Sequence, residues 1–366
     1  MYKPDYLMMT PGPSIVRENV MKGRSEFFGN PDLDEDFFIF YDKLAEKTAK
    51  IFGTKKENMI FMSGEGMVGL DSACASLTEP GDRVLVIENG LFGAGFADMV
   101  TPYGGKPVTL SFNTKRKIDI EKVKEFLEKD SDFKFATVVH CDTPTGVLND
   151  VKEICKFLKS KGILTVVDTV AAIGGEKFNA EEYGADIALG GSQKCFSAPP
   201  GITMLSVSDD AWKAIENRKT PIASFYCNLS YWKNCVENRL FPYTMPSSDL
   251  IGFDIAVDNI LEEGIENLVE RHHKVAKYCR EGLEKLGLKL YMEDNFSSTV
   301  TAFYVPERFT VKEFIKKLKD EYKIFIGGSY GPYADKILRI GHMGESAKIE
   351  YIEKTLNAIK DMLKNN

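Results

Sequence analysis

Three glycines in "SGEGMVG", Gly64, Gly66 and Gly69, have the G-x-G-x-x-G spacing of a dinucleotide-binding turn. The apolar run "NMIFM" precedes them, the helix-like "LDSACASL" follows, and Glu88 comes 19 residues after Gly69. A ribose-binding acid is expected at about that distance. The backbone amides of a strand-to-helix turn, however, bind a phosphate of any cofactor equally well. The turn therefore predicts an anion site and leaves the cofactor open.

An acid and a lysine follow two later apolar runs of the chain. Asp168 ends "LTVVD", and Lys194 lies 26 residues further on, in "SQKCFSAPPG" after "ALGG". Because parallel strands present their carboxyl ends at one edge of a sheet, both residues would face the same rim as the glycine turn. Taken alone, each has an ordinary interpretation, since lysines are mostly exposed and aspartates often cap helices. Whether Asp168 and Lys194 form a functional site therefore depends on residues elsewhere in the chain.

The elements that would position these residues alternate along the first part of the chain. Short runs rich in β-branched residues are separated by segments with helical periodicity, which predicts strands and helices in turn. The predicted strands cover residues 59–63, 83–89, 107–112, 135–141, 164–170, 185–191 and 202–207. Seven strands with helices between most of them imply an α/β fold, with a mainly parallel sheet covered by helices on both faces.

The pattern changes near residue 249. Two helices in series are predicted at 249–264 and 265–287, and a smaller α+β unit follows them. In that unit we expect strands at 297–305, 324–328 and 337–341 and helices at 311–321 and 346–363. This organisation predicts an N-terminal arm at 1–16, a large domain at 17–250 and a small C-terminal domain at 251–366.

Composition narrows the classes of function. The 366 residues are 43% hydrophobic, enough to bury a large core, and the formal charge of −7 is mixed in sign along the chain. We expect no nucleic-acid partner and no membrane contact, because no basic face, signal peptide or membrane-length apolar run is visible. Seven cysteines without a C-x-x-C pair and only four histidines favour reduced thiols, a cytoplasmic protein and no metal site.

Together, eight segments of the chain resemble the class V, fold-type I aminotransferases that use pyridoxal 5'-phosphate, specifically the alanine-glyoxylate and serine-pyruvate aminotransferase group. The resemblance spans essentially the whole chain. It implies that the anion at the glycine turn is the cofactor's phosphate and that the G-x-G-x-x-G spacing is coincidental. The segments are "TPGPS" (10–14), "SGEG" (63–66), "NGLFG" (89–93), "HCDTPTG" (140–146), "VDTVAAIGG" (167–175), "GSQKCFSAPPG" (191–201), "FPYT" (241–244) and "LRIGHMG" (338–344).

The resemblance implies a role for each residue around the cofactor ring. Lys194 would bind the cofactor covalently and, once displaced by the amino substrate, carry a proton between the substrate Cα and the cofactor C4′. That role needs a pKa below the usual ~10.4 of lysine. Asp168 would stabilise the protonated ring nitrogen, which makes the ring a better electron sink. Phe92 would stack on the ring, and Thr143 would bond its phenolic oxygen or the phosphate region.

The same resemblance places the cofactor's phosphate at the glycine turn. The backbone amides of Ser63, Gly64 and Glu65, with the Ser63 hydroxyl, would form the phosphate cradle. We expect the Glu65 carboxylate to point away from this dianion. Gln193 and, from the neighbouring subunit, Thr244 would complete the phosphate site. The implied active site is therefore shared between the subunits of a homodimer.

Two further segments bear on the cofactor and the substrate. The family usually has a phosphate-binding tyrosine three residues before that threonine, whereas this chain has Phe241. One phosphate hydrogen bond would then be lost unless water or Tyr243 replaces it. Arg339 in "LRIGHMG" would bind the substrate α-carboxylate with its forked guanidinium, and Gly12 in "TPGPS" would lie near the same carboxylate.

The predicted reaction moves an amino group from a small neutral amino acid, alanine or serine, to glyoxylate or pyruvate. Only Arg339 lies in a recognisable carboxylate-binding motif, so a second carboxylate on the donor would lack a partner. Lys22, Arg24 or an arginine of the other subunit could still supply one. The segment 25–38, "SEFFGNPDLDEDFF", departs from the usual family form near the substrate entrance and is expected to determine specificity.

Several alternatives remain open at this point. Cysteine desulfurases typically have a histidine over the ring and another before the lysine, where this chain has Phe92 and Gln193. A 2-aminoethylphosphonate-pyruvate transaminase is nearer, because "HCDTPTG" resembles its segment, although an asparagine is expected there before the lysine. An aspartate-type class V transaminase is a further alternative. Outside the class, the alternatives are an NAD-binding oxidoreductase and a binding protein without catalytic activity.

Overall fold

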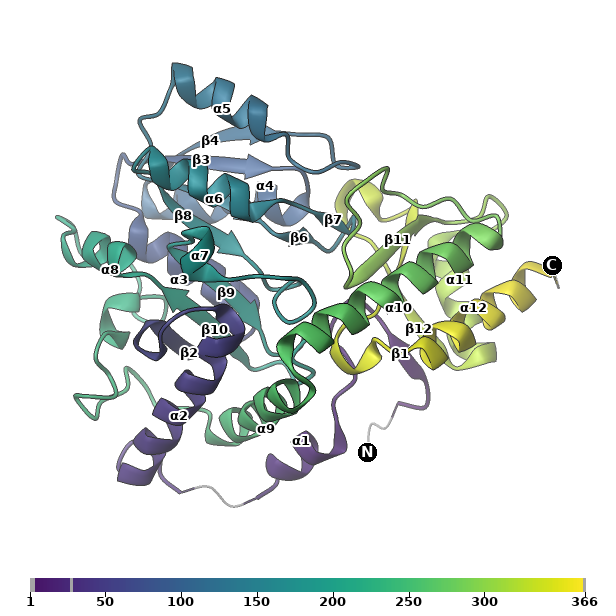
Figure 1. Cartoon of the computed structure of the whole chain (residues 1–366), viewed down its shortest axis with the longest axis horizontal. Helices are drawn as coiled ribbons and strands as arrows, with labels where there is room; N and C mark the ends of the chain where they lie inside the picture. Colours follow the sequence, from purple (N-terminus) through teal and green to yellow (C-terminus); the bar gives the residue numbers. More distant parts are fainter. Residues whose placement is uncertain (1–3, 27–28, 365–366) are drawn as a thin grey trace.

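The computed structural model describes residues 4–26 and 29–364, and a seven-stranded sheet forms its larger half (Figure 1). The strand order is β2-β10-β9-β8-β5-β3-β4, and neighbours are parallel except where β10 pairs with β2 and β9. The predicted mainly parallel α/β sheet is confirmed. Its strands are β2 (Met59–Ser63), β3 (Arg83–Glu88), β4 (Lys106–Ser111), β5 (Phe135–Val139), β8 (Leu164–Asp168), β9 (Ile187–Gly191) and β10 (Ile202–Val207).

The single reversed strand decides which loops meet. Because β10 is antiparallel to both β2 and β9, those two strands run in the same direction. Strand β8 is parallel to β9, so β2, β8 and β9 all end at one edge of the sheet. The glycine turn after β2 therefore shares this edge with the residues that follow β8 and β9.

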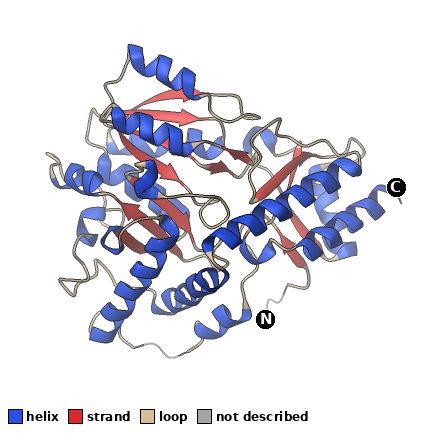
Figure 2. Cartoon of the chain, viewed as in Figure 1, coloured by secondary structure: helices blue, strands red, loops and turns tan. Residues whose placement is uncertain are grey.

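Helices cover both faces of the large sheet (Figure 2), as its fully buried strands β5 and β9 require. In α6, Val151, Ile154, Cys155 and Leu158 are the buried residues, a helical stripe that faces the sheet. Helix α6 contacts α5 and α7, whereas α3 contacts α4 and α8. The helices are α2 (Glu35–Phe52), α3 (Gly66–Leu77), α4 (Leu91–Val100), α5 (Ile120–Lys129), α6 (Val151–Ser160), α7 (Ala180–Tyr183) and α8 (Asp209–Glu216).

A second, smaller sheet joins the two ends of the chain. Its order is β1-β12-β13-β11, and β1 from the N-terminal arm pairs in parallel with β12. The sequence analysis assigned no strand to this arm. The elements here are β1 (Leu7–Met9), β11 (Val300–Tyr304), β12 (Ile324–Gly328) and β13 (Ile337–Gly341), with helices α11 (Val311–Tyr322) and α12 (Ile349–Lys364).

Two helices in series connect the sheets, as predicted (Figure 1). Helix α9 (Ser247–Glu263) packs on α1 (Glu18–Gly23) and α2, and α10 (Ile265–Lys285) packs on α12. Leu268 of α10 belongs to the core around the large sheet, and Val275, Cys279 and Leu283 belong to the core around the small sheet. The proposed domain boundary at residue 250 falls within α9.

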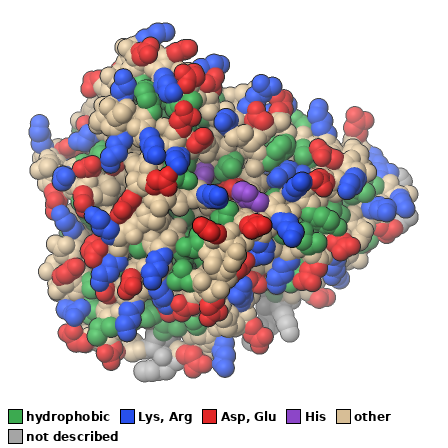
Figure 3. Space-filling model, viewed as in Figure 1, with side chains coloured by type: hydrophobic (Ala, Val, Ile, Leu, Met, Phe, Trp, Pro, Cys, Tyr) green, Lys and Arg blue, Asp and Glu red, His purple; other side chains and the backbone are tan. Residues whose placement is uncertain are grey.

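The remaining short elements lie in the connections. They are the hairpin strands β6 (Cys141–Asp142) and β7 (Val147–Leu148) and the 3-10 turns η1 (Lys56–Asn58), η2 (Thr101–Tyr103), η3 (Leu229–Trp232), η4 (Gly331–Tyr333) and η5 (Gly344–Ser346). On the face drawn in Figure 3, acidic and basic side chains are intermixed. Within residues 4–26 and 29–364, no helix is long and apolar enough to cross a membrane.

Candidate active site

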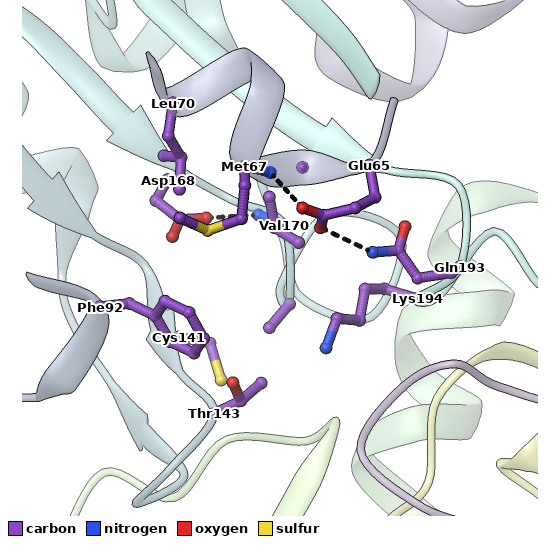
Figure 4. A pocket seen from close by; sticks show the side chains of 12 residues that line it. Glu65, Met67, Leu70, Phe92, Cys141, Thr143, Asp168, Val170, Gln193 and Lys194 are labelled. Atoms are coloured by element: carbon purple, nitrogen blue, oxygen red, sulfur yellow. Dashed lines mark hydrogen bonds between the residues drawn. The ribbon is translucent and has the colours of Figure 1, made fainter. Parts of the chain in front are cut away.

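A cavity lies at the edge of the large sheet where β8 and β9 end (Figure 4). Asp168 is the last residue of β8, Lys194 lies in the loop after β9, and Glu65 lies in the turn between β2 and α3. The fold thus brings the predicted acid, lysine and glycine turn to one place. The cavity is lined by Glu65, Gly66, Met67, Leu70, Phe92, Cys141, Thr143, Asp168, Val170, Ala171, Gln193 and Lys194.

The N-terminal arm holds the amine of Lys194. Its Nζ donates a hydrogen bond to the backbone carbonyl of Pro11, at 2.7 Å. Gly12 has φ +91°, and a Cβ on it would lie 2.5 Å from the Lys194 Cδ. Both the backbone conformation and the space therefore require glycine at this position. Pro11 and Gly12 accordingly lie against the Lys194 side chain, although neither is among the residues that line the cavity.

The charges of Lys194 and Asp168 are shifted toward neutrality. Burial lowers the pKa of Lys194, the Arg339 guanidinium lowers it further, and Asp168 acts in the opposite direction. Burial also raises the pKa of Asp168 to about 6, opposed by the Val170 N–H, 2.9 Å from its Oδ1, and by Lys194. The Asp168 carboxylate is thus charged above about pH 6, and the lysine amine loses its proton more easily than in water.

Asp142, which the sequence analysis did not assign, positions Phe92. Its Oδ2 accepts hydrogen bonds from the backbone N–H groups of Phe92 (2.9 Å) and Gly93 (3.3 Å) in the first turn of α4. At Gly90, any side chain would collide with this carboxylate. Asp142 is fully buried, and burial raises its pKa to about 7. The available signal was an acid directly after the end of the fourth predicted strand, inside "HCDTPTG".

Two of the three amides predicted for the phosphate cradle already have protein acceptors. The Ser63 N–H donates to the Tyr243 hydroxyl at 3.3 Å, and the Gly64 N–H donates to the Gly201 carbonyl at 2.8 Å. Ser63 itself is exposed and is not among the cavity-lining residues. The Tyr243 hydroxyl keeps its own proton for a further acceptor. The turn therefore offers fewer donors to an anion than its sequence suggested.

The Glu65 carboxylate caps the N-terminus of α3, at the place where the sequence analysis expected it to point away from a bound phosphate. One oxygen accepts the Met67 N–H of α3 at 3.1 Å, and the other accepts the Gln193 Nε2 at 3.3 Å (Figure 4). A carboxylate at this place satisfies a helix N–H group and the helix dipole, which explains the orientation. Among the described residues the buried Oε1 of Gln193 has no hydrogen-bond partner. A second anion here would compete with Glu65.

Thr244 and Phe241 lie outside this cavity. The Thr244 hydroxyl donates to Asp32 at 2.7 Å, and neither residue is among those that line the cavity. Phe241 is buried and stacks on Phe38, with ring centroids 4.8 Å apart. It is a core residue, which accounts for phenylalanine at that position. Of the proposed specificity segment 25–38, residues 27–28 lie outside the described residues, and the others do not line this cavity.

Arg339 lies on β13 of the small sheet and reaches the large domain's loop. Its Nε donates to the Gly328 carbonyl at 2.8 Å, its Nη2 donates to the same carbonyl, and its Nη1 donates to the Thr143 carbonyl at 3.0 Å. Those bonds use three of the five guanidinium N–H groups. One N–H on each terminal nitrogen is left to donate to a carboxylate.

The residues that line the cavity fit the ring of pyridoxal phosphate better than they fit its phosphate. A flat aromatic aldehyde would find the amine of Lys194, the buried carboxylate of Asp168 and the aromatic ring of Phe92, all of which line the cavity (Figure 4). At the phosphate end, the N-terminus of α3 and the unpartnered Gln193 amide oxygen mark a polar pocket. Glu65 also lies at this end, and its negative carboxylate would repel a phosphate.

Comparisons with known proteins agree with this site. Residues 10–333 match the family described as aminotransferase class-V. The pyridoxamine-pyruvate transaminase of Mesorhizobium japonicum is 32% identical over 96% of this chain and 90% of its own length. The ureidoglycine-glyoxylate aminotransferase structure from Bacillus subtilis has a TM-score of 0.95 at 30% identity, covering 100% of this chain and 94% of that chain. The alanine-glyoxylate aminotransferase structure from Nostoc sp. has a TM-score of 0.95 at 27% identity, covering 99% and 96%.

These matches confirm the expected fold-type I architecture and the resemblance to the alanine-glyoxylate group. Enzymes of this family depend on pyridoxal phosphate and transfer amino groups between amino compounds and oxo acids. The glycine spacing is therefore no longer interpreted as a dinucleotide-binding turn, because the family uses pyridoxal phosphate. With the family match covering most of its length, the chain belongs to the class V pyridoxal-phosphate-dependent aminotransferases.

Proposed function

We propose that this aminotransferase takes its amino group from a small neutral amino acid, such as alanine or serine, and passes it to glyoxylate or pyruvate. The observation that carries the proposal is the single buried guanidinium of Arg339, whose unused N–H pair suits one carboxylate. Arg339 reaches this cavity through its hydrogen bond to the carbonyl of Thr143, which lines it, and no arginine is itself among the lining residues. A donor with one carboxylate therefore fits, and a distal carboxylate would be buried without a partner.

The proposed roles follow the placement of the side chains. Pyridoxal phosphate, when bound, supplies the electron sink for the electrons of the substrate Cα–H bond. Lys194, with its lowered pKa, accepts the Cα proton and returns one to the cofactor side. Asp168 would hold the proton of the ring nitrogen, Phe92 would cover one face of the ring, and Arg339 would bind the substrate carboxylate.

The donor preference gives a direct prediction. Alanine and serine are expected to exceed aspartate and glutamate by more than about tenfold in kcat/KM, because burying an unpaired carboxylate costs several kcal/mol and ~1.4 kcal/mol is a factor of ten. The measurement is a comparison of the second-order rate constants of the four donors with glyoxylate as common acceptor. A preference for either acidic donor would contradict the proposal and point to a cation outside the described cavity.

We also propose that the active form is a homodimer in the cytoplasm. The hydroxyl of Thr244 lies away from the cavity of its own chain, which supports a role across a subunit interface. The same segment exposes several large apolar side chains, a composition typical of interfaces rather than of free surface. These are Phe225, Tyr226, Tyr231 and Leu240. Seven free cysteine thiols support a reducing compartment.

Glu65 favours a second candidate function. Its carboxylate caps α3 at the place proposed for the cofactor's phosphate, and two anions at one helix N-terminus repel each other. A vitamer without a phosphate, such as pyridoxamine, would meet a hydrogen-bond acceptor there instead of a repelling charge. The name of the Mesorhizobium relative describes transamination between pyridoxamine and pyruvate. The candidate function is therefore the same reaction at Lys194, with free pyridoxamine as the amino donor.

Replacing Glu65 with glutamine separates the two candidates. We expect Glu65→Gln to tighten pyridoxal phosphate binding by about tenfold or more, since unit charges ~5 Å apart repel by ~3 kcal/mol at an effective dielectric constant of 20. Binding of pyridoxal, which lacks the phosphate, should change by less than about threefold. Both affinities are measured by equilibrium absorbance titration, with the exposed Glu57→Gln as the matched control.

The wild-type protein in the same titration decides between the functions. Tight binding of pyridoxal phosphate and no turnover of pyridoxamine with pyruvate support the amino-acid transaminase. Weak binding of pyridoxal phosphate together with turnover of pyridoxamine supports the second candidate. If Glu65→Gln leaves the affinity for pyridoxal phosphate unchanged, the carboxylate does not oppose the phosphate, and the argument for the second candidate fails.

A further inference from the structure

An aromatic ring covers the guanidinium that is proposed to bind substrate. The ring centroid of Tyr330 lies 4.9 Å from the Cζ of Arg339. Arg339 is 3% exposed and Tyr330 is 58% exposed, so the ring stands between the guanidinium and solvent. The N–H groups of arginine lie in the guanidinium plane, and a ring over its face consumes none of them. The stacking therefore leaves the free N–H pair at the guanidinium edge available.

The segment that carries Tyr330 is anchored on both sides. The Ser329 hydroxyl donates to the Pro144 carbonyl at 2.8 Å, and the Ser329 N–H donates to the Ile337 carbonyl at 3.2 Å. A Cβ on Gly331 would lie 3.4 Å from the Leu91 Cδ1, at the start of the helix that carries Phe92, so this glycine lies close to that helix. Tyr330 is thus held between the small sheet and the first turn of α4, although its own ring is largely exposed.

The charge of Arg339 depends on its neighbours. Burial lowers the pKa of Arg339, whereas the Tyr330 hydroxyl and the Asp142 carboxylate act in the opposite direction. The hydrogen bonds recorded for its guanidinium go to the backbone carbonyls of Gly328 and Thr143 and to no carboxylate among the described residues. A buried cation that lacks an acidic partner is an anion-binding group, and the π face of a tyrosine is a neutral way to stabilise it.

We propose that Tyr330 is a positioning residue for the substrate carboxylate, holding the Arg339 guanidinium so that its free edge receives the one carboxylate shared by the amino donor and the oxo acid. This inference rests on the proposed role of Arg339 and deepens it. A phenyl ring supplies the same π face, whereas an aliphatic side chain of similar size does not. The stacked ring is thus the part assigned to positioning, and Tyr330→Phe removes only the hydroxyl, which itself raises the pKa of Arg339.

Three variants test this role. We expect Tyr330→Leu to raise KM for alanine and for pyruvate by about tenfold, with kcat within about twofold, since loss of a partly desolvated cation–π contact weakens carboxylate binding by about that factor. Tyr330→Phe should restore both KM values to within about threefold of wild type. The control is Tyr278→Leu. Tyr278 is also an exposed tyrosine but lies on α10, so its replacement should change neither KM value.

Alaninamide, an amine without a carboxylate, distinguishes a failure of the role proposed for Tyr330 from a failure of the proposed function. If wild-type protein uses alanine and alaninamide equally well, the carboxylate role of Arg339 fails, and with it the proposed function. If the wild-type protein prefers alanine to alaninamide and Tyr330→Leu keeps the full preference, the carboxylate role of Arg339 is supported and the role of Tyr330 is overturned. A Tyr330→Leu protein that loses affinity for alanine but not for alaninamide supports the inference. A Tyr330→Phe protein as impaired as Tyr330→Leu would contradict the role of the ring.

Discussion

Replacing Lys194 with alanine is expected to lower turnover by about 10³- to 10⁴-fold, the range of a positioned group that provides both covalent and acid–base catalysis. Lys194 is the residue with an amine among those that line the cavity. Burial and Arg339 lower its pKa, which favours the neutral amine that a base needs. No neighbouring side chain of the cavity can take over this proton transfer at the same atom.

Steady-state rates with alanine and glyoxylate measure this effect, and Lys277→Ala is the matched control. Lys277 lies on α10 with its side chain 74% exposed, so its loss should leave activity unchanged. Circular dichroism of both variants checks that each is folded. A Lys194→Ala protein with full multiple turnover would show that the proton carrier lies elsewhere.

The second large effect is expected at Arg339. Arg339→Gln should lower kcat/KM for alanine by about 10²- to 10³-fold, because two hydrogen bonds from a charged group are worth ~3–4 kcal/mol together. Arg339→Lys should recover only part of this loss, since an ammonium is a point charge and cannot match the forked geometry. The ratio of kcat/KM for alanine to that for alaninamide is the measured quantity. It should fall toward one in Arg339→Gln.

Arg339 also links the small sheet to the turn between β6 and β7 through the Thr143 carbonyl, so its loss can affect the fold. The ratio between the two donors removes that contribution, because damage to the fold lowers both rates together. Equal losses for alanine and alaninamide would mean that Arg339 acts only as a structural link.

The fold was largely predictable because its signals are local. Continuous apolar runs such as "FATVV" and "IALGG" became fully buried strands, and the breaks between them became helices with one apolar stripe. Strand ends were less accurate. The predicted strand 135–141 ends at Val139, because the His140 N–H turns to the Asp168 carbonyl and the chain enters β6. The pairing of β1 with β12 had no local signal, since its partner is more than 300 residues away.

The site was predictable where a residue type follows a strand end. Asp168 and Lys194 share a cavity because parallel strands end together, which sequence alone indicates. The sequence does not predict the direction in which a side chain points. Glu65 was expected to face away, but an unpaired helix N–H attracts its carboxylate. Asp142 acts on Phe92 through a contact between segments 50 residues apart, and Tyr330 stacks on Arg339, nine residues further along the chain. The sequence analysis assigned neither contact.

The account rests on Lys194 as the residue that binds the cofactor, and chemical trapping tests it most directly. The full-length protein is incubated with pyridoxal phosphate or pyridoxal, treated with borohydride, digested and analysed by mass spectrometry. Borohydride fixes an aldehyde cofactor to the lysine amine with which it has condensed. We predict one modified peptide, the one that contains Lys194, with either vitamer. An unmodified Lys194 peptide together with a label on another lysine would contradict the account.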